Sequence, residues 1–212
     1  IGRNFEESFL KAVRSLEVGL FHVKHPKFDS MGEEELLKYI ETGTDDRIYA
    51  IAQLLRLGCN VDKIINATGI DKFFISKLQK IVAVEGYLKN NRLDMEVLRL
   101  AKETGFCDRI IGELWKMTEQ KVFDLRKQNG IMPVYKMIDS CASEFDSYIP
   151  YFYSTYEVEN ESIVSDKQKV VVLGSGPIRI GQGVEFDYST VHAVKTIKEA
   201  GYEAIIINNN PE

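Results

Sequence analysis

The stretch Val170–Tyr188, VVVLGSGPIRIGQGVEFDY, joins an apolar run to a glycine-rich loop. The continuous run of β-branched residues before the loop is typical of a strand that is buried on both faces. After the loop, residues 187–201 (DYSTVHAVKTIKEAG) have the periodicity of an amphipathic helix, and residues 203–208 (EAIIIN) form a second apolar run. A strand, a loop, a helix and a second strand in this order predict a βαβ unit with parallel strands.

The glycine-rich loop departs from the two common nucleotide-binding motifs. Arg179 occupies the position of the third glycine in G-x-G-x-x-G, and the second strand ends in asparagines (residues 208–210) where a dinucleotide site has an acid. A Walker loop would need Gly-Lys followed by Ser or Thr, which this stretch lacks. The sequence therefore disfavours both a dinucleotide site and a P-loop.

The loop is nevertheless a candidate ligand site, because ligands bind at the carboxyl ends of the strands in open α/β sheets. Its candidate residues are Gly174, Gly176, Arg179, Gly181, Gln182, Gly183 and Glu185. The guanidinium group of Arg179 suits a carboxylate or phosphate. Glu212 follows the second strand, and adjacent parallel strands lie about 4.8 Å apart, so Glu185 and Glu212 can line one crevice. The spacing leaves open a plainer alternative, in which Arg179 and Glu185 pair only with neighbouring side chains.

Residues 1 to about 130 have the pattern of successive short helices. Candidate capping residues precede several apolar-periodic segments, and two of them have a Glu three residues later as in a capping box. These residues are Asn4 (with Glu7), Ser30 (with Glu33), Thr44, Asn60 and Asp71. A faint repeat relates residues 52–65 to residues 98–111, but two copies are too few for a solenoid. We expect a compact helical bundle.

The residue composition and the hydrophobic pattern change after Pro133. Residues 134–140 (VYKMIDS) and 151–157 (YFYSTYE) are rich in β-branched and aromatic residues, which predicts strands or extended arms. Residues 158–168 (VENESIVSDKQ) are polar and acidic, which predicts a linker. The chain is therefore expected to be a multi-domain fragment: a mainly α-helical domain followed by the first βαβ unit of an α/β domain.

Composition narrows the function classes. The 212 residues include 27 Lys and Arg against 32 Asp and Glu, which gives a net charge of −5 without a basic stripe for nucleic acid. Residues 61–81 are spaced like a helix-turn-helix, but Phe73 and Phe74 indicate core positions instead. No apolar run approaches the roughly 20 residues that span a bilayer. The first residues lack the basic and apolar regions of a signal peptide, so we expect none. We expect a cytoplasmic protein that binds neither nucleic acid nor membrane.

The positions of the cysteines and histidines favour neither a disulfide framework nor a metal site. Cys59, Cys107 and Cys141 are far apart and odd in number, which predicts buried structural thiols in a reducing compartment. His22 and His25 have a spacing that metal ligands use, but Pro26 interrupts the helix, so we expect a surface loop and no metal site. Trp115 lies among apolar residues and is predicted to be core. The chain begins without Met and stops at NNNPE, so both ends are expected to be cut from a longer chain.

The residues VVVLGSGPIRIGQGVEFDYSTVHA, together with GYEAIIINNNPE, closely resemble the large subunit of carbamoyl phosphate synthetase. The form IRIGQGVEFDY is similar to the opening of the second, carbamoyl-phosphate-forming half of that family. IGRNFEESFLKAVRSLE resembles the end of the first half, and PVYKMIDSCASEF resembles part of the central oligomerisation domain. The resemblance implies three regions: residues 1–20 as the end of the first half, 21–160 as the helical oligomerisation domain with linker, and 161–212 as the truncated, Rossmann-like pre-ATP-grasp start of the second half.

The resemblance implies an ATP-dependent ligase. The family makes carbamoyl phosphate from bicarbonate, two ATP and ammonia, which a small amidotransferase subunit releases from glutamine. The parent is expected to use ATP with Mg or Mn, and K as a further ion, whereas this fragment is expected to bind no cofactor and to contain no catalytic residue. Expected partners are the rest of the large subunit, the small subunit and further copies through the helical domain. The resemblance implies a product used in arginine biosynthesis, in pyrimidine biosynthesis or in both, and the sequence leaves these alternatives open.

The resemblance also gives the glycine-rich loop a role. Glu185 and Glu212 match positions that line the carbamate tunnel in the family, and Arg179 and Gln182 lie in the same loop. The glycines allow the backbone to approach a narrow passage. The alternative function, from a different class, is a purely structural oligomerisation or interaction module.

Overall fold

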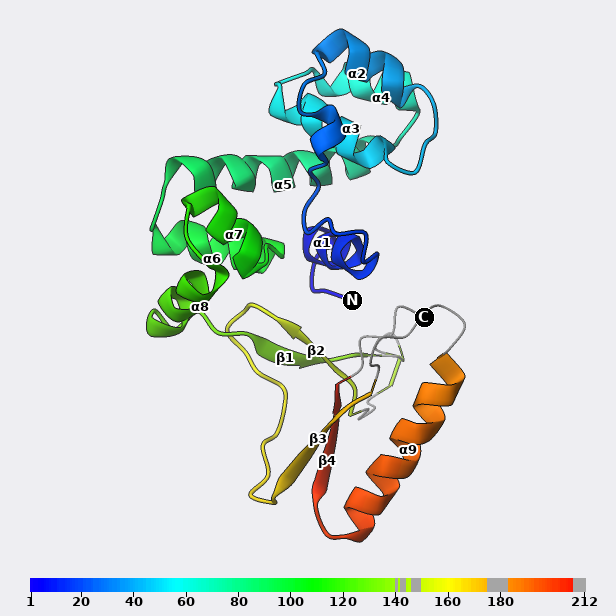
Figure 1. Cartoon of the computed structure of the whole chain (residues 1–212), viewed down its shortest axis with the longest axis vertical. Coiled ribbons are helices and arrows are strands. Elements are labelled where there is room, and N and C mark those ends of the chain that lie inside the picture. Colours follow the sequence, from blue (N-terminus) through cyan, green and yellow to red (C-terminus); the bar gives the residue numbers. More distant parts are fainter. Residues whose placement is uncertain (140, 142–143, 146–149, 175–182, 208–212) are drawn as a thin grey trace. The chain divides into compact units, whose positions relative to one another are not determined.

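The computed structural model describes residues 1–139, 141, 144–145, 150–174 and 183–207, with the backbone alone for residues 183–187. The chain divides into two compact units, Ile1–Ser162 (unit 1) and Ile163–Glu212 (unit 2), which are described separately. Figure 1 shows that unit 1 is helical up to a two-stranded sheet, whereas unit 2 is a pair of strands and one helix. The predicted sequence of a helical region, extended arms and a βαβ unit is confirmed.

The helices of unit 1 form two groups joined by a long helix. The first group follows α1 (Phe5–Ser15) and the short η1 (Pro26–Phe28); it consists of α2 (Glu33–Ile40), α3 (Arg47–Arg56) and α4 (Val61–Thr68). The second group consists of α6 (Met95–Thr104), α7 (Asp108–Trp115) and α8 (Glu119–Gln128). The long helix α5 (Lys72–Asn90) contacts α3 and α4 in the first group, α6 and α7 in the second, and α1. The two groups flank α5 in Figure 1, and they contain the two faintly similar sequence segments.

Local sequence signals set most of the helix ends. The side chains of Asn60 and Asp71 accept hydrogen bonds from the backbone two residues on, which confirms both as N-caps. Gly58 and Gly69 have φ values of +79° and +67°, the left-handed conformation that ends α3 and α4. Asn4 caps α1 as predicted, but the reciprocal bond differs.

Three predictions about caps are wrong in detail. The carboxylate of Glu7 accepts from the N–H of Arg3 at 2.8 Å, not from that of Asn4. The N-cap of α2 is Gly32 and has no side-chain bond, so Ser30 caps nothing. The N-cap of α3 is Asp46, and Thr44 instead donates its hydroxyl to Asp46 at 2.8 Å. For Glu7 and Thr44, a nearby backbone or side-chain group offers a competing partner.

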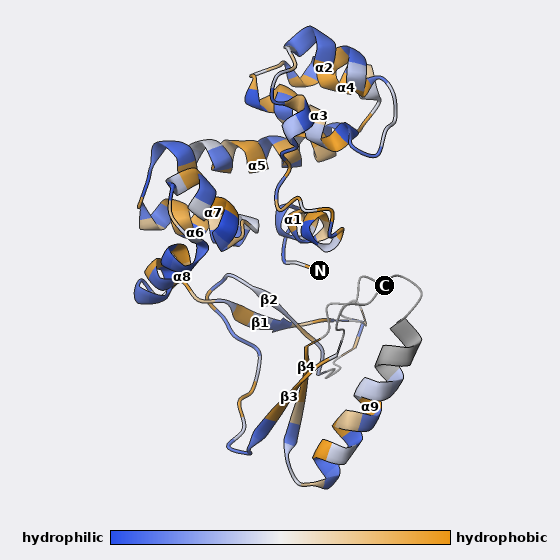
Figure 2. Cartoon of the chain, viewed as in Figure 1, coloured by the Kyte–Doolittle hydropathy of each residue, from blue (hydrophilic) through white to orange (hydrophobic). Residues whose placement is uncertain are grey.

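The core of unit 1 lies between the helices. Fully buried residues come from every helical group and include Leu10, Leu36, Leu54, Ile75 and Trp115. Trp115 is core as predicted, and its indole N–H donates to the carbonyl of Leu88 at 2.8 Å. Figure 2 shows hydrophobic and hydrophilic residues alternating along these helices, as amphipathic packing requires.

Some predicted side-chain environments are corrected. Phe73 and Phe74 are about half exposed, because they pack beside Phe5 of α1 rather than in the interior. Cys59 is buried as predicted, but Cys107 and Cys141 are only partly buried.

His22 lies in a loop as predicted, but it is buried rather than at the surface, because its Nε2 lies 3.1 Å from the carboxylate of Glu85 on α5. Glu85 gathers further charged partners. Arg56 of α3 donates to it at 2.9 and 3.0 Å, and Lys89 donates at 2.5 Å. Burial raises the pKa of Glu85, but the bond to His22 and the charge of Arg56 outweigh it, so the pKa lies well below the usual value of 4.5. Burial also lowers the pKa of His22, despite the neighbouring carboxylate.

The strand pair of unit 1 is docked on its helices. Strands β1 (Val134–Met137) and β2 (Phe152–Thr155) are antiparallel, which confirms the predicted extended arms. The hydroxyl of Thr155 donates to the buried carboxylate of Glu7 at 2.9 Å, and Lys11 donates to the carbonyl of Ser154 at 2.6 Å. These bonds join β2 to α1.

Tyr156, which follows β2, lies against a buried cluster of charged residues. Lys102 and Arg126 contact Asp108 at 2.6 and 2.7 Å, and their cationic groups lie 4.8 and 5.8 Å from the ring centre of Tyr156. Burial raises the pKa of Tyr156 to about 12 and lowers the pKa of Lys102. The phenol is therefore neutral, and its ring packs against the two cations.

Replacing Trp115 by Ala should lower the free energy of unfolding of unit 1 by about 3–5 kcal/mol, because it removes a fully buried aromatic ring. Urea unfolding followed by circular dichroism measures the change. The matched control is Tyr87→Ala on α5, an aromatic residue that is 53% exposed and should cost no more than about 0.5 kcal/mol. Equal losses in the two variants would contradict the assigned core.

Replacing Glu85 by Gln should cost about 3–5 kcal/mol at neutral pH, because Arg56 would stay buried without its counter-ion. In the unaltered chain, the lowered pKa makes this stabilisation complete above the unfolded value of 4.5 and progressively lost as pH falls below it. Unfolding measured from pH 7 to pH 3 should therefore be less pH-dependent in Glu85→Gln. Glu113→Gln, at an exposed carboxylate of α7, is the control and should keep the original pH profile.

Candidate functional site

The candidate site lies at one edge of the strand pair in unit 2. Strands β3 (Lys169–Leu173) and β4 (Glu203–Ile207) are parallel, as predicted, and Leu173 pairs with Ile207. The segments that follow both strands therefore leave the sheet at the same edge. These segments hold the glycine-rich loop and the last residues of the chain, so the topology agrees with the arrangement predicted for them.

Gly174 closes this edge of the sheet. Its N–H donates to the carbonyl of Ile207 at 2.9 Å, which extends the parallel pairing by one bond beyond Leu173. A Cβ at this position would lie 3.1 Å from Cγ2 of Ile206 and 3.3 Å from Cγ2 of Thr190. Glycine fits this position without crowding, whereas an added methyl group would press on side chains of β4 and of the helix.

Helix α9 (Gly183–Glu199) covers one face of the strands. The hydroxyl of Thr190 donates to the carbonyl of Gly174 at 3.2 Å, which ties the helix to the end of β3. Val170 and Val172 are half-buried on the same face as Gly174, while Val171 and Leu173 on the other face are exposed. Figure 2 colours β3 and β4 as mainly hydrophobic, in agreement with the apolar runs of the sequence.

The helix begins earlier than predicted. We expected it from residue 187, but it starts at Gly183, so Glu185 and Asp187 fall at its N-terminal end. The glycine-rich loop is correspondingly shorter, and it leads directly into the N-terminus of α9, which carries a partial positive charge.

The predicted site residues are described to different extents. Gly174 and Gly183 lie at the two ends of the loop, and Glu185 lies in the first turn of α9, where only the backbone is described. The rest of the predicted set lies outside the described residues: Gly176, Arg179, Gly181, Gln182 and Glu212. Whether Glu185 and Glu212 line one passage therefore stays a prediction. Thr190 was not predicted, because only the folded contact with Gly174 distinguishes it from other helix residues.

A hollow in the described part of unit 2 lies at the opposite end of the strands, where they begin. Its volume is about 460 Å³, and it is lined by residues at the beginnings of the two strands and the end of α9, among them Lys167, Lys198 and Tyr202. Glu203 at this edge contacts Lys169 at 3.7 Å and also accepts a hydrogen bond from Ser165. This hollow is separate from the edge at which the glycine-rich loop begins.

Three further findings concern the described residues. Within them, no group of three His, Cys, Asp or Glu side chains is placed to hold a metal ion. His22 contacts Glu85, whereas Nδ1 of His25 accepts from the N–H of Lys27 at 3.1 Å, so the two histidines face different partners. None of the helices in the described part of the chain is long and apolar enough to cross a membrane.

Comparison with protein families identifies both parts of the chain. Residues 1–130 match the family model of the carbamoyl-phosphate synthetase large chain oligomerisation domain. Residues 166–212 match that of the carbamoyl phosphate synthase preATP-grasp domain. The first match covers the helices of unit 1 and the second covers β3, α9 and β4.

Replacing Gly174 by Ala should destabilise the strand pair of unit 2 by about 1–3 kcal/mol, because the added methyl group meets Ile206 and Thr190. Amide hydrogen exchange in β3 and β4 reports the change, since local opening exposes these amides. Adding Thr190→Ser should recover part of the loss, because Ser lacks the crowding methyl group but keeps the hydroxyl bond to Gly174. Thr196→Ser, whose hydroxyl bonds within α9, is the control and should recover nothing.

Proposed function

Because this chain belongs to the family of carbamoyl-phosphate synthetase large chains, we propose that it is an internal segment of the large subunit of the glutamine-dependent enzyme. That enzyme forms carbamoyl phosphate from bicarbonate, two ATP and ammonia released from glutamine. The family is one of ligases. The observation that carries the proposal is the order of the two matched domains, with the oligomerisation domain before the preATP-grasp domain.

The domain order supports a position between the two halves of the large subunit. We propose that residues 166–212 open the second, carbamoyl-phosphate-forming half, in line with the IGQGVEFDY motif. Residues 1–20 are proposed as the end of the first half; the family match that begins at residue 1 does not separate them from the helical domain. The helical domain is proposed to associate with further copies of the chain.

For the glycine-rich loop we propose a role in passing carbamate between the halves. The side chains proposed to line the passage are Glu185, Glu212, Arg179 and Gln182. The glycines lack side chains, so the backbone of the loop can approach the passage closely. An anionic carbamate beside ionised carboxylates would be disfavoured by like-charge repulsion. We therefore propose that carbamate passes as its neutral acid or beside partly protonated glutamates.

This segment is proposed to contribute no catalytic residue. ATP, with Mg or Mn and a K ion, is proposed to bind elsewhere in the large subunit, and a small amidotransferase subunit is the proposed source of ammonia. The whole enzyme is proposed to act in the cytoplasm, for arginine and pyrimidine biosynthesis. A second candidate function, a purely structural oligomerisation module, is favoured by the extent of the helical match over residues 1–130.

Glu185→Ala in the complete large subunit, assayed with the small subunit, distinguishes the two functions. A role in carbamate passage predicts that bicarbonate-dependent ATP hydrolysis persists while carbamoyl phosphate formation falls about ten-fold or more, which uncouples the two rates. Glu199→Ala, at an exposed carboxylate in the last turn of α9, should leave both rates unchanged.

If Glu185→Ala also leaves both rates unchanged, the loop is structural and the oligomerisation module is the better account. If the unaltered enzyme shows no bicarbonate-dependent hydrolysis, the proposed reaction itself is wrong.

A further inference from the structure

The segment that follows β2 returns along the free edge of β1. The N–H of Glu161 donates to the carbonyl of Tyr135 at 2.9 Å, and the N–H of Tyr135 donates to the side chain of Asn160 at 2.8 Å. The N–H of Met137 donates to the carboxylate of Glu161 at 2.7 Å. Residues 157–161 therefore occupy the edge of β1 that β2 leaves open, although they form no regular strand.

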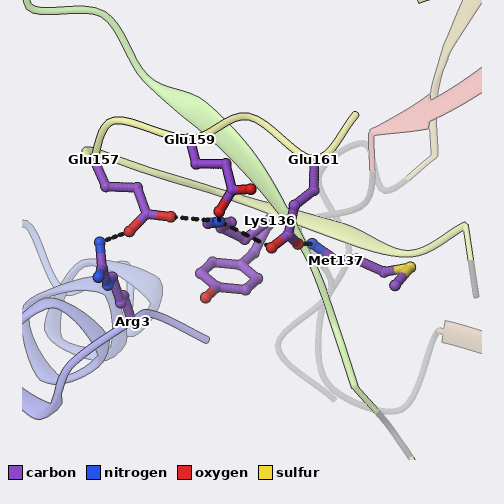
Figure 3. Close-up of a pocket in the computed structure, with 7 residues that line it drawn as sticks. Arg3, Lys136, Met137, Glu157, Glu159 and Glu161 are labelled. Carbon is purple, nitrogen blue, oxygen red and sulfur yellow. Dashed lines mark hydrogen bonds and ion pairs between the residues drawn. The ribbon is translucent and has the colours of Figure 1, made fainter. Parts of the chain in front are cut away.

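Lys136 is the electrostatic centre of this arrangement. Its ammonium nitrogen lies 2.7 Å from Glu157, 2.9 Å from Glu159 and 2.9 Å from Glu161, and its side chain is only 13% exposed. Figure 3 shows the three carboxylates converging on this one lysine, with Arg3 on the far side of Glu157. The ammonium group donates hydrogen bonds to Glu159 and Glu161, and it contacts Glu157 as an ion pair without a hydrogen bond.

The three ion pairs differ in strength. The side chain of Glu157 is nearly buried, and its charge is shielded from solvent by Arg3 and Lys136. The side chain of Glu159 is 77% exposed, so its pair with Lys136 is weak and screened by salt. The side chain of Glu161 is 38% exposed, and this residue also bonds to Tyr135 and Met137. The segment is thus held at both of its ends and only lightly at Glu159 between them.

Only residues 162–164 separate this segment from Ser165, the first residue that is hydrogen-bonded within unit 2. Ser162 accepts from the side chain of Asn160 at 2.8 Å, and Ser165 bonds to Glu203 of β4. Ile163 and Val164, between them, are 82% and 78% exposed. From Glu161 to Ser165 the chain can span at most roughly 14 Å. If residues 157–161 were released, the span from Tyr156 to Ser165 would reach roughly 32 Å.

We propose that residues 157–161 form a releasable strap, closed on Lys136, which sets the length of the tether between the two units. With the strap closed, the tether is a few residues long. Loss of the lysine charge opens the strap and more than doubles the reach of the tether. The inference rests on the described contacts of residues 157–161 and of Ser165, and it does not depend on the proposed function.

Amide hydrogen exchange measured by NMR on the whole chain tests the strap. Lys136→Met keeps the length of the side chain but removes its charge, and it should speed exchange at Tyr135, Met137 and Glu161 about ten-fold or more. Exchange in α5 should stay unchanged, which shows that the helices remain folded. The control Lys121→Met removes an equal charge from an exposed position on α8 and should leave all three amides as they were.

Two results would overturn the proposal. In the first, these amides of the unaltered chain exchange as fast as those of Ile163 and Val164, so that no strap is closed. In the second, Lys136→Met exchanges like the unaltered chain, so that the lysine does not hold the strap. Should Lys136→Met lose the protection of α5, the double variant Glu159→Gln, Glu161→Gln replaces it. Glutamine keeps an acceptor for Met137 but carries no charge, so exchange should still accelerate several-fold, and no acceleration rejects the proposal.

Discussion

Glu85 carries a negative charge into the interior of unit 1, on the helix that contacts both flanking groups of helices. A buried carboxylate is tolerated only when it is paired and hydrogen-bonded. Its partners come from separate parts of the chain: His22 from the loop after α1, Arg56 from α3 and Lys89 from α5 itself. Arg56 also donates to the carbonyl of Val23 at 2.8 Å, so the same charge system fixes the loop. Satisfying one carboxylate thus aligns α3, α5 and the segment that leaves α1, and the apolar core packs within that frame.

The same constraint recurs at the junction between the helices and the strand pair. Asp108 is neutralised by Lys102 and Arg126, whose cationic groups in turn support the ring of Tyr156. Glu7, buried near the start of α1, accepts from Thr155. These contacts explain why the compact unit extends to Ser162 although the family match of the helical domain ends at residue 130. The strand pair belongs to the helical unit because Thr155, and Tyr156 directly after β2, contact buried charged residues of the helices.

Periodicity and local capping residues made much of the fold predictable. Contacts between residues far apart in the sequence could not be predicted. Asn60 and Asp71 cap helices through bonds two residues along the chain, so the sequence around them suffices. His22 could not be placed, since Glu85 lies 63 residues away and only the folded chain brings them together. At the candidate site, the parallel strands followed from the βαβ order, but the start of α9 and the contact of Thr190 with Gly174 depend on the packing of helix against strand. The side chains predicted to line the passage lie outside the described structure, so their predicted roles stay predictions; they are Arg179, Gln182, Glu185 and Glu212.

The region between the two family matches determines how long the connection between the two units is. Residues 131–165 belong to neither match, and a free linker of this length would have an average end-to-end distance of roughly 30 Å and a far larger maximum. Most of the region is instead bonded to unit 1: β1 and β2 pair with each other, β2 is tied to α1, and residues 157–161 lie along β1. The residues that join the two units therefore begin after Glu161 rather than after residue 130. A long connecting sequence is thereby converted into a short tether, and the contacts of residues 157–161 with β1 determine how short it is.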